Sequence, residues 1–109
     1  GWIKQFCINH GENTYDFIIE KIEYFKKRQF ISQSEFQEIY DTFCNENGVG
    51  LRYRKSKQGL NDALEEYCSH HGIYYNKSKN KSINSISTNC RWFGDEEIYD
   101  AGNDDDLPF

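Results

Sequence analysis

The fold is decided by residues 52–93, which read RYRKSKQGLNDALEEYCSHHGIYYNKSKNKSINSISTNCRWF. In the middle of this stretch, apolar residues recur at positions 60, 63, 64, 67 and 68, which is the spacing of one buried helix face. Ser56 is a suitable N-cap and Gly72 a suitable stop. The pattern therefore predicts a helix over residues 57–71, with basic and aromatic residues on both flanks.

The segment after this helix predicts a β-hairpin. We expect one strand to begin at residues 73–75, a polar turn to occupy residues 76–82, and the returning strand to end at residues 91–93. In the returning strand, positions 86, 88, 90 and 92 alternate with positions 87, 89, 91 and 93. The phase of Trp92 places it in the core, and we expect Arg91 and Phe93 on the outside.

Two further core helices are predicted upstream. Apolar spacing indicates helices at about residues 15–28 and 33–46, with a very short strand at 29–32 between them. Residues 2–8 predict a helical turn or two. This order is that of a winged helix-turn-helix domain. We therefore expect an α+β fold with three main helices and a small antiparallel β-hairpin as the wing, followed by an acidic C-terminal tail.

The charges divide the chain into two parts. Residues 95–109 carry seven acids and no base, whereas residues 49–94 carry eight bases and three acids. The net charge of -5 therefore hides a basic surface on the body. We expect a DNA-binding domain at residues 1–94 and an acidic tail at residues 95–109.

The flanks of helix 57–71 supply the residue types that hold a nucleic-acid strand, because cations neutralise phosphates and rings stack on bases. The predicted DNA-binding residues are Arg52, Tyr53, Arg54, Lys55, Lys57, Tyr74, Tyr75, Lys77, Lys79, Lys81, Arg91 and Phe93. The helix itself carries Asp62, Glu65 and Glu66 on its outer face, which disfavours insertion into a major groove.

Three lysines of the hairpin stand at alternate positions. An extended strand would put Lys77, Lys79 and Lys81 on one side, at intervals of about 7 Å. We expect this row to contact a phosphate backbone. The alternative is a mobile polar wing that is simply exposed to solvent.

No catalytic or metal site is predicted. The cysteines Cys7, Cys44, Cys68 and Cys90 have no CxxC spacing, and we expect reduced thiols in a cytoplasmic protein. No nucleophile motif, glycine-rich phosphate loop or metal-ligand spacing occurs, so we expect neither an enzyme nor a cofactor. No apolar run approaches the roughly 20 residues of a membrane span.

The last six residues, Asp104-Asp105-Asp106-Leu107-Pro108-Phe109, resemble the acidic tip of bacterial single-stranded DNA-binding proteins. That resemblance implies a docking peptide for replication or repair proteins. Phe109 would fill an apolar pocket, its terminal carboxylate would meet a basic side chain, and the aspartates would steer the approach. The alternative is a generic acidic tail.

The body departs from that family, whose members have a five-stranded OB-fold and a long linker. Together, body and tail resemble the small winged-helix single-stranded DNA-binding proteins of staphylococcal cassette chromosome elements. The resemblance implies a non-catalytic, largely sequence-independent binder of single-stranded DNA that serves replication of a mobile genetic element. Self-association is possible. Two alternatives are a winged-helix domain that binds duplex DNA, as in a regulator or a primase-helicase accessory domain, and an adaptor that works only through its tail.

Overall fold

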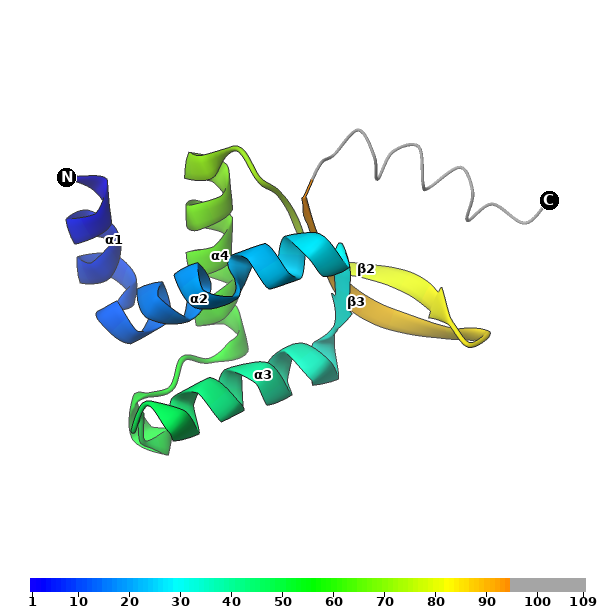
Figure 1. Ribbon diagram of the computed structural model, residues 1–109, viewed down its shortest axis with the longest axis horizontal. Helices are drawn as coiled ribbons and strands as arrows, with labels where there is room; N and C mark the ends of the chain where they lie inside the picture. Colours follow the sequence, from blue (N-terminus) through cyan, green and yellow to red (C-terminus); the bar gives the residue numbers. More distant parts are fainter. Residues whose placement is uncertain (95–109) are drawn as a thin grey trace.

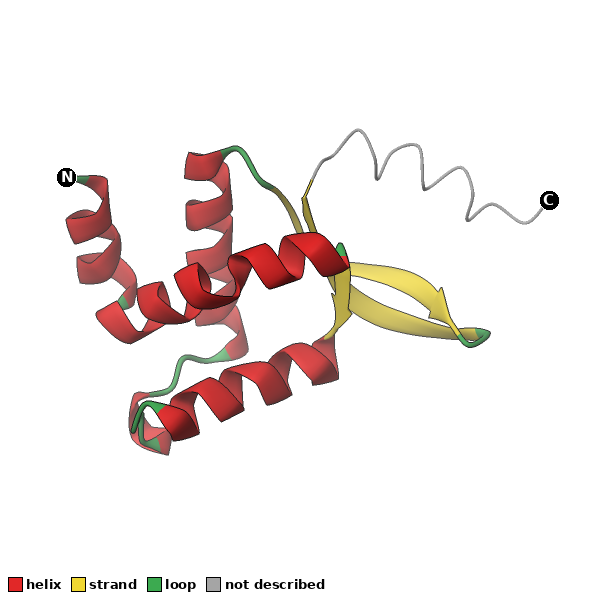
Figure 2. Ribbon diagram, viewed as in Figure 1, coloured by secondary structure: helices red, strands yellow, loops and turns green. Residues whose placement is uncertain are grey.

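The computed structural model describes residues 1–94 as four α-helices and a three-stranded antiparallel sheet (Figures 1 and 2). In chain order the elements are α1 (Trp2–His10), α2 (Glu12–Arg28), β1 (Phe30–Ser32), α3 (Gln33–Glu46), the 3-10 helix η1 (Leu51–Tyr53), α4 (Lys57–His71), β2 (Tyr74–Ile83) and β3 (Ile86–Gly94). The predicted α+β class is confirmed, and the arrangement is compatible with a winged helix. The predicted tail at 95–109, with its docking peptide Asp104–Phe109, lies outside the described residues.

Capping residues determine where two of the helices begin. At the start of α4, the Ser56 side chain accepts a hydrogen bond from the Gly59 N–H at 3.0 Å. Gly72 ends the same helix in the left-handed conformation, with a φ of 67°. Ser32 caps α3 by accepting from the Glu35 N–H at 3.1 Å. These bounds confirm the predicted helices at 57–71 and 33–46.

The N-terminal segment is more helical than predicted. α1 continues to His10, and α2 begins at Glu12, three residues before the predicted start. Gly11 joins the two helices with a φ of 93°, a value that side chains disfavour and glycine tolerates. Thr14 is buried in the first turn of α2.

The helices enclose one hydrophobic core. Phe17 of α2 lies inside it and makes edge contacts with Phe36, Tyr40 and Phe43 of α3, at centroid distances of 5.0–5.8 Å. The predicted apolar face of α4 is buried in the same core. α1 packs against this body through Phe6, which is fully buried.

β3 is the central strand of the sheet, between β1 and the longer edge strand β2. Figure 1 shows β2 and β3 projecting from the helical body as a hairpin. The helix-facing side of the sheet contributes Ile31, Tyr75 and Phe93 to the core. The opposite side carries a second cluster, which consists of Cys90 and Trp92 with Phe30, Tyr74 and Ile83 packed around them.

The hairpin turns later than predicted. The predicted turn at 76–82 is wrong, because these residues belong to β2 and the ladder continues to the pair Ile83–Ile86. The turn is formed by Asn84 and Ser85, with φ values of 52° and 67°. Two positive φ values are the requirement of a type I′ turn, which matches the twist of a hairpin. Cross-strand pairing thus makes a regular strand of a sequence whose polar composition is typical of a loop.

None of the helices within residues 1–94 is both long and apolar enough to cross a lipid bilayer.

Candidate nucleic-acid interface

A β-bulge divides the hairpin lysines between the two sides of the sheet. Residues 77–78 together stand opposite the single residue Arg91. A bulge reverses the alternation of side chains along a strand. The prediction of one row of lysines is therefore wrong: Lys79 and Lys81 lie over the rings of the second cluster, whereas Lys77 lines a groove beside α4.

Hydrogen bonds to side chains hold the bulge in place. The Ser78 N–H donates to Asn76 Oδ1 at 3.1 Å, and Ser78 Oγ donates to Asn89 Oδ1 at 3.1 Å. From the first turn of α3, Gln33 Nε2 donates to the Lys77 carbonyl oxygen at 2.8 Å. The bulge is therefore tied both to β3 and to the helical body.

Aromatic rings position the two outer lysines. Lys79 Nζ lies 4.8 Å from the centre of the Trp92 ring, and Lys81 Nζ lies 5.6 Å from that of Phe30. Trp92 also donates its indole N–H to the Lys79 carbonyl oxygen at 2.9 Å. The two rings are themselves in contact, at 5.2 Å. We call this set, together with the half-buried Tyr74, the outer face.

The third lysine belongs to a separate site. A groove of about 330 Å³ lies where the starts of α3 and α4 meet the bulge of β2. We call it the basic groove, and its lining residues are Gln33, Lys57, Gln58, Asn61, Lys77 and Ser78. Lys57 is the first residue of α4, where the helix dipole is positive. Among residues 1–94, no carboxylate lines the groove, although Asp62 accepts a hydrogen bond from Gln58 Nε2 at 2.9 Å beside it.

Arg91 is the buried neighbour of this groove. It was predicted to contact DNA from the outside, but its side chain is only 1% exposed, because its set of β3 residues faces the helices. Arg91 Nη1 donates to Asn61 Oδ1 and, at 2.8 Å, to the Tyr75 hydroxyl. Its guanidinium carbon lies 4.0 Å from the centre of the Phe36 ring. Direct contact with DNA is therefore excluded for this side chain.

Two of the four predicted stacking rings are used inside the fold. Phe93 is fully buried, and its ring stacks on that of Phe25 with centroids 4.9 Å apart. Tyr75 packs partly buried on the core and donates its hydroxyl to Asn61 Oδ1 at 3.1 Å. Burial raises the pKa of Tyr75 to about 12, against the opposing effect of the nearby Arg91. The ring of Phe93 is therefore unavailable to a base, and that of Tyr75 is held against the core.

The predicted basic loop before α4 is also partly structural. Arg54 donates to the Val49 carbonyl oxygen at 3.0 Å and to Asn45 Oδ1 at 2.6 Å. The Lys55 N–H donates to the Tyr40 hydroxyl at 2.8 Å. These bonds fix the loop to the end of α3. Arg54 thus has a structural role in this loop, and its predicted contact with DNA stays a prediction.

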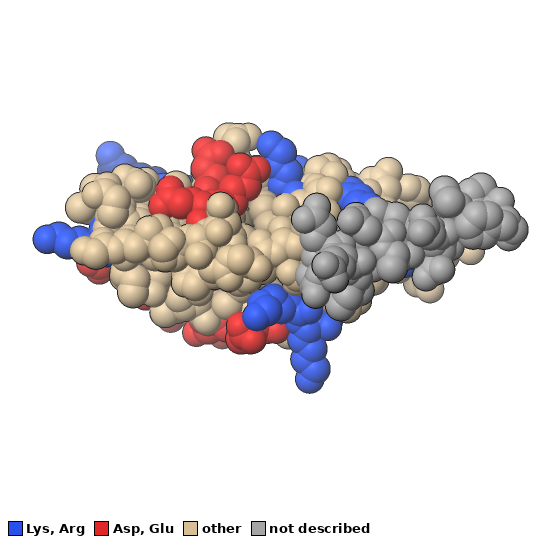
Figure 3. All heavy atoms as spheres, turned by 90° about the horizontal axis from the view of Figure 1, so that it is seen from above, with Lys and Arg blue, Asp and Glu red and all other residues tan. Residues whose placement is uncertain are grey.

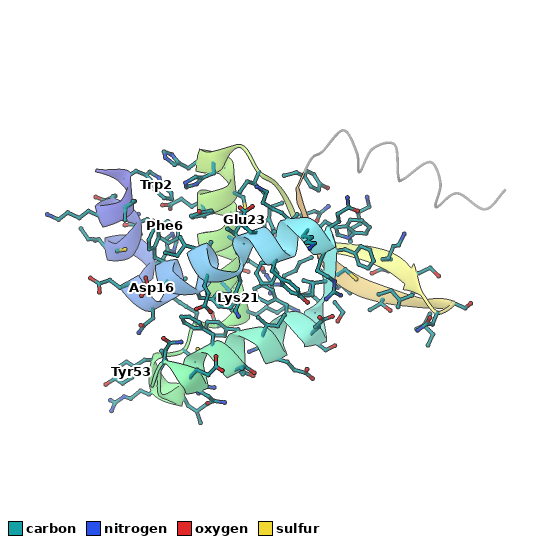
Figure 4. The ribbon with its side chains drawn as sticks, in the orientation of Figure 1. Trp2, Phe6, Asp16, Lys21, Glu23 and Tyr53 are labelled. Atoms are coloured by element: carbon teal, nitrogen blue, oxygen red, sulfur yellow. The ribbon has the colours of Figure 1, made fainter. Side chains whose placement is uncertain are left out.

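Exposed residues of the same loop lie far from the hairpin. Tyr53 is 74% exposed, and Arg52 lies against its ring, with Cζ 6.0 Å from the ring centre. Figure 4 places Tyr53 at the opposite end of the long axis from the hairpin tip. The two flanks of α4 therefore do not form one continuous surface in the described part of the chain. Lys57 does share a groove with the hairpin lysine Lys77.

The acidic side of α4 is as predicted. Asp62 and Glu65 are exposed, and Glu66 is held by His10, whose Nε2 lies 3.0 Å from Glu66 Oε1. In the view of Figure 3, the acids gather over the helical half of the molecule, and basic side chains lie nearer to the hairpin as well as at the far end. Residues 73–94 contain no Asp or Glu. The hairpin is therefore an acid-free part of the body, as residues 47–61 also are.

Sequence reasoning missed several residues of these two sites, namely Phe30, Gln33, Gln58 and Ser78. Asn61 was expected on the outer face of the helix, where it could touch nucleic acid. One signal was present for Asn61, which lies next to Leu60 on the apolar face of α4 and is 7% exposed. A polar residue on a buried helix face requires a hydrogen-bond partner. No sequence signal indicated which partner it would have.

Within residues 1–94, no three His, Cys, Asp or Glu side chains are grouped so that they could hold a metal ion. All four cysteines are free thiols, and burial raises the pKa of Cys68 to about 12. A thiol with such a pKa is a poor nucleophile at neutral pH.

Comparison with known proteins adds no relative to this picture. No protein-family model matches the sequence, and no curated protein or solved structure matches it closely enough to identify a family.

Proposed function

We propose that this chain is a winged-helix domain that binds single-stranded DNA, largely independently of sequence and without catalysis. The order α2, β1, α3, α4, β2, β3, with a sheet ordered β1-β3-β2, supports a winged helix in which β2 and β3 form the wing. The resemblance of the sequence to replication proteins of mobile elements suggests the setting. The acidic tip would recruit replication or repair proteins.

The observation that carries the proposal is the separation of charge on the described body. The hairpin offers Lys79 and Lys81 at fixed positions over aromatic rings, and Lys77 meets Lys57 across the basic groove. Such cations neutralise phosphates, while the half-buried Tyr74 is the remaining ring at this end for stacking on a base.

A winged helix more commonly suggests binding to duplex DNA, so the choice of an unpaired strand needs its own argument. In duplex binders of the helix-turn-helix type, the second helix of the motif enters the major groove, and here that helix is α4. Its exposed Asp62 and Glu65 would lie close to phosphates along the walls of that groove. A flexible single strand can follow the hairpin and avoid them, which favours the single-stranded target.

The lysines of the outer face provide the test. Fluorescence anisotropy would give the affinity for labelled oligo-dT over a range of salt concentrations. Each lost phosphate contact lowers the slope of log K against log salt by about 0.7 for single strands. We expect Lys79→Gln/Lys81→Gln to lower that slope by roughly 1.4.

The matched control is Lys4→Gln/Lys21→Gln, which removes the same charge from α1 and α2, away from the hairpin. This control should keep the wild-type slope. An equal effect of both double variants would mean that net charge alone governs binding, and the assignment to the hairpin would then be rejected.

A further inference from the structure

We propose that the basic groove is a binding site for one phosphate group, backed by the buried cation of Arg91 and closed by the amide of Asn61. This inference rests on the proposed function for its natural ligand, a phosphodiester of the DNA strand. It goes further by naming the residues that would hold that phosphate.

The first argument is a buried charge without a counter-ion. Arg91 is 1% exposed, and among the described residues it forms no ion pair with a carboxylate. Its hydrogen-bond acceptors are the neutral Asn61 and Tyr75, and its Nε has no partner in the described part of the chain. A buried guanidinium is normally paired. An anion nearby would supply the missing compensation.

The second argument is the orientation of Asn61, which is 93% buried yet lines the basic groove. Its Oδ1 accepts from both Arg91 and Tyr75, so this oxygen is directed to the interior. The Nδ2 group is then left as a donor, with no acceptor found for it among residues 1–94. The amide dipole of Asn61 thus has its negative end on the Arg91 cation and its positive end available to the groove.

The third argument is that two lysines and the N-terminus of α4 lie at the basic groove. Lys57 and Lys77 come from two elements and line the same groove. The backbone N–H groups at the start of α4 add the positive end of the helix dipole, and of these groups that of Gly59 donates to Ser56 Oγ. The groove volume of about 330 Å³ admits a phosphate together with its neighbouring atoms. Two cations thus line the groove, together with one buried acceptor, Gln33 Oε1, which has no partner among the described residues. Gln58 Nε2 is already bonded to Asp62.

The substitution Asn61→Asp separates binding from folding. An aspartate keeps the acceptor for Arg91 and Tyr75, supplies the absent carboxylate, and replaces the amide donor by an oxygen that repels phosphate. We therefore expect a melting temperature no lower than that of the wild type. The affinity for oligo-dT should fall about tenfold or more, as expected for the loss of a charge-assisted contact. Asn13→Asp, at an exposed position of α2, is the control of equal charge.

Two probes distinguish this site from DNA binding as a whole. In the first experiment, inorganic phosphate is titrated into isotope-labelled protein and the amide chemical shifts are recorded. The signals of residues 57–61 and 77–78 should move in the wild type and not in Asn61→Asp. Thymidine, which carries no phosphate, should not move them. If phosphate leaves these signals in place, or if Asn61→Asp binds oligo-dT like the wild type, the site is wrong even though DNA binding stands.

The reverse result is equally informative. Suppose that the wild type does not bind oligo-dT, but that phosphate moves the amide signals of the groove residues and no longer does so in Asn61→Asp. The anion site would then stand, and the proposed function would be rejected. Should Asn61→Asp fail to fold, the idea that Arg91 lacks a counter-ion is contradicted. The exposed pair Lys57→Gln/Lys77→Gln then tests the groove itself, and unchanged phosphate shifts in that variant would overturn the site.

Discussion

Phe93 is one of the side chains on which the whole core depends. It is fully buried in β3, contacts the ring of Phe25 at 4.9 Å and that of Tyr75 at 5.1 Å, and so joins the sheet to α2. Its neighbour Arg91 is buried beside it and lies over Phe36. These two residues were expected on the surface, and their burial changes what their substitution should do.

Replacing Phe93 by alanine should therefore affect folding and not binding. Removal of a buried phenylalanine ring costs about 3–5 kcal/mol in unfolding free energy, which urea denaturation would measure. The control is Tyr53→Ala, an exposed position that should change stability by no more than about 0.5 kcal/mol. A Phe93→Ala protein of unchanged stability that has lost its DNA affinity would restore the stacking role.

The alternation in β3 was predicted correctly, but its direction was not. Positions 90 and 92 do alternate with positions 91 and 93. Both sets are buried, because this sheet has a second apolar cluster on the side away from the helices. The alternation of side chains along a strand indicates which residues share a side of the sheet. It does not indicate which side faces the larger core. Because arginine is usually exposed, Arg91 favoured the incorrect prediction that its side of β3 faces the solvent.

The helices and the hairpin differ in how far the sequence could predict them. Ser32, Ser56 and Gly72 are local signals whose hydrogen bonds or dihedral angles the structure contains, so the helix bounds followed from them. The turn at residues 84–85 has no glycine, and the bulge at residues 77–78 depends on Gln33 from a distant helix. The bulge is held by this tertiary contact, which explains why the spacing of the lysines was misread.

The same turn yields a prediction. Ser85 has a φ of 67°, a conformation that is costly for a residue with a Cβ atom and easy for glycine. We expect Ser85→Gly to raise the unfolding free energy by about 1 kcal/mol in urea denaturation. Ser82→Gly, in the regular part of β2, is the control and should lower it by about 0.5–1 kcal/mol. A destabilised Ser85→Gly protein would show that the strained turn is not the limiting feature.

Across the described body, the acids lie apart from the hairpin. The hairpin and the start of α4 carry cations, the exposed acids of α4 lie on the helical half, and further cations lie at the far end, where Tyr53 is also found (Figures 3 and 4). The expected cradle around α4 is therefore replaced by two smaller basic sites on opposite sides of one sheet. A strand that passes over the hairpin edge could contact both, which fits an extended and flexible ligand better than a rigid duplex.

The most direct measurement is a competition between the two forms of one DNA sequence. Labelled oligo-dT bound to the full chain would be displaced by an unlabelled single strand and, separately, by the same strand annealed to its complement, at one fixed salt concentration. The account predicts that the single strand competes at least about tenfold better, because α4 repels the walls of a major groove. Equal competition, or stronger competition by the duplex, would contradict it.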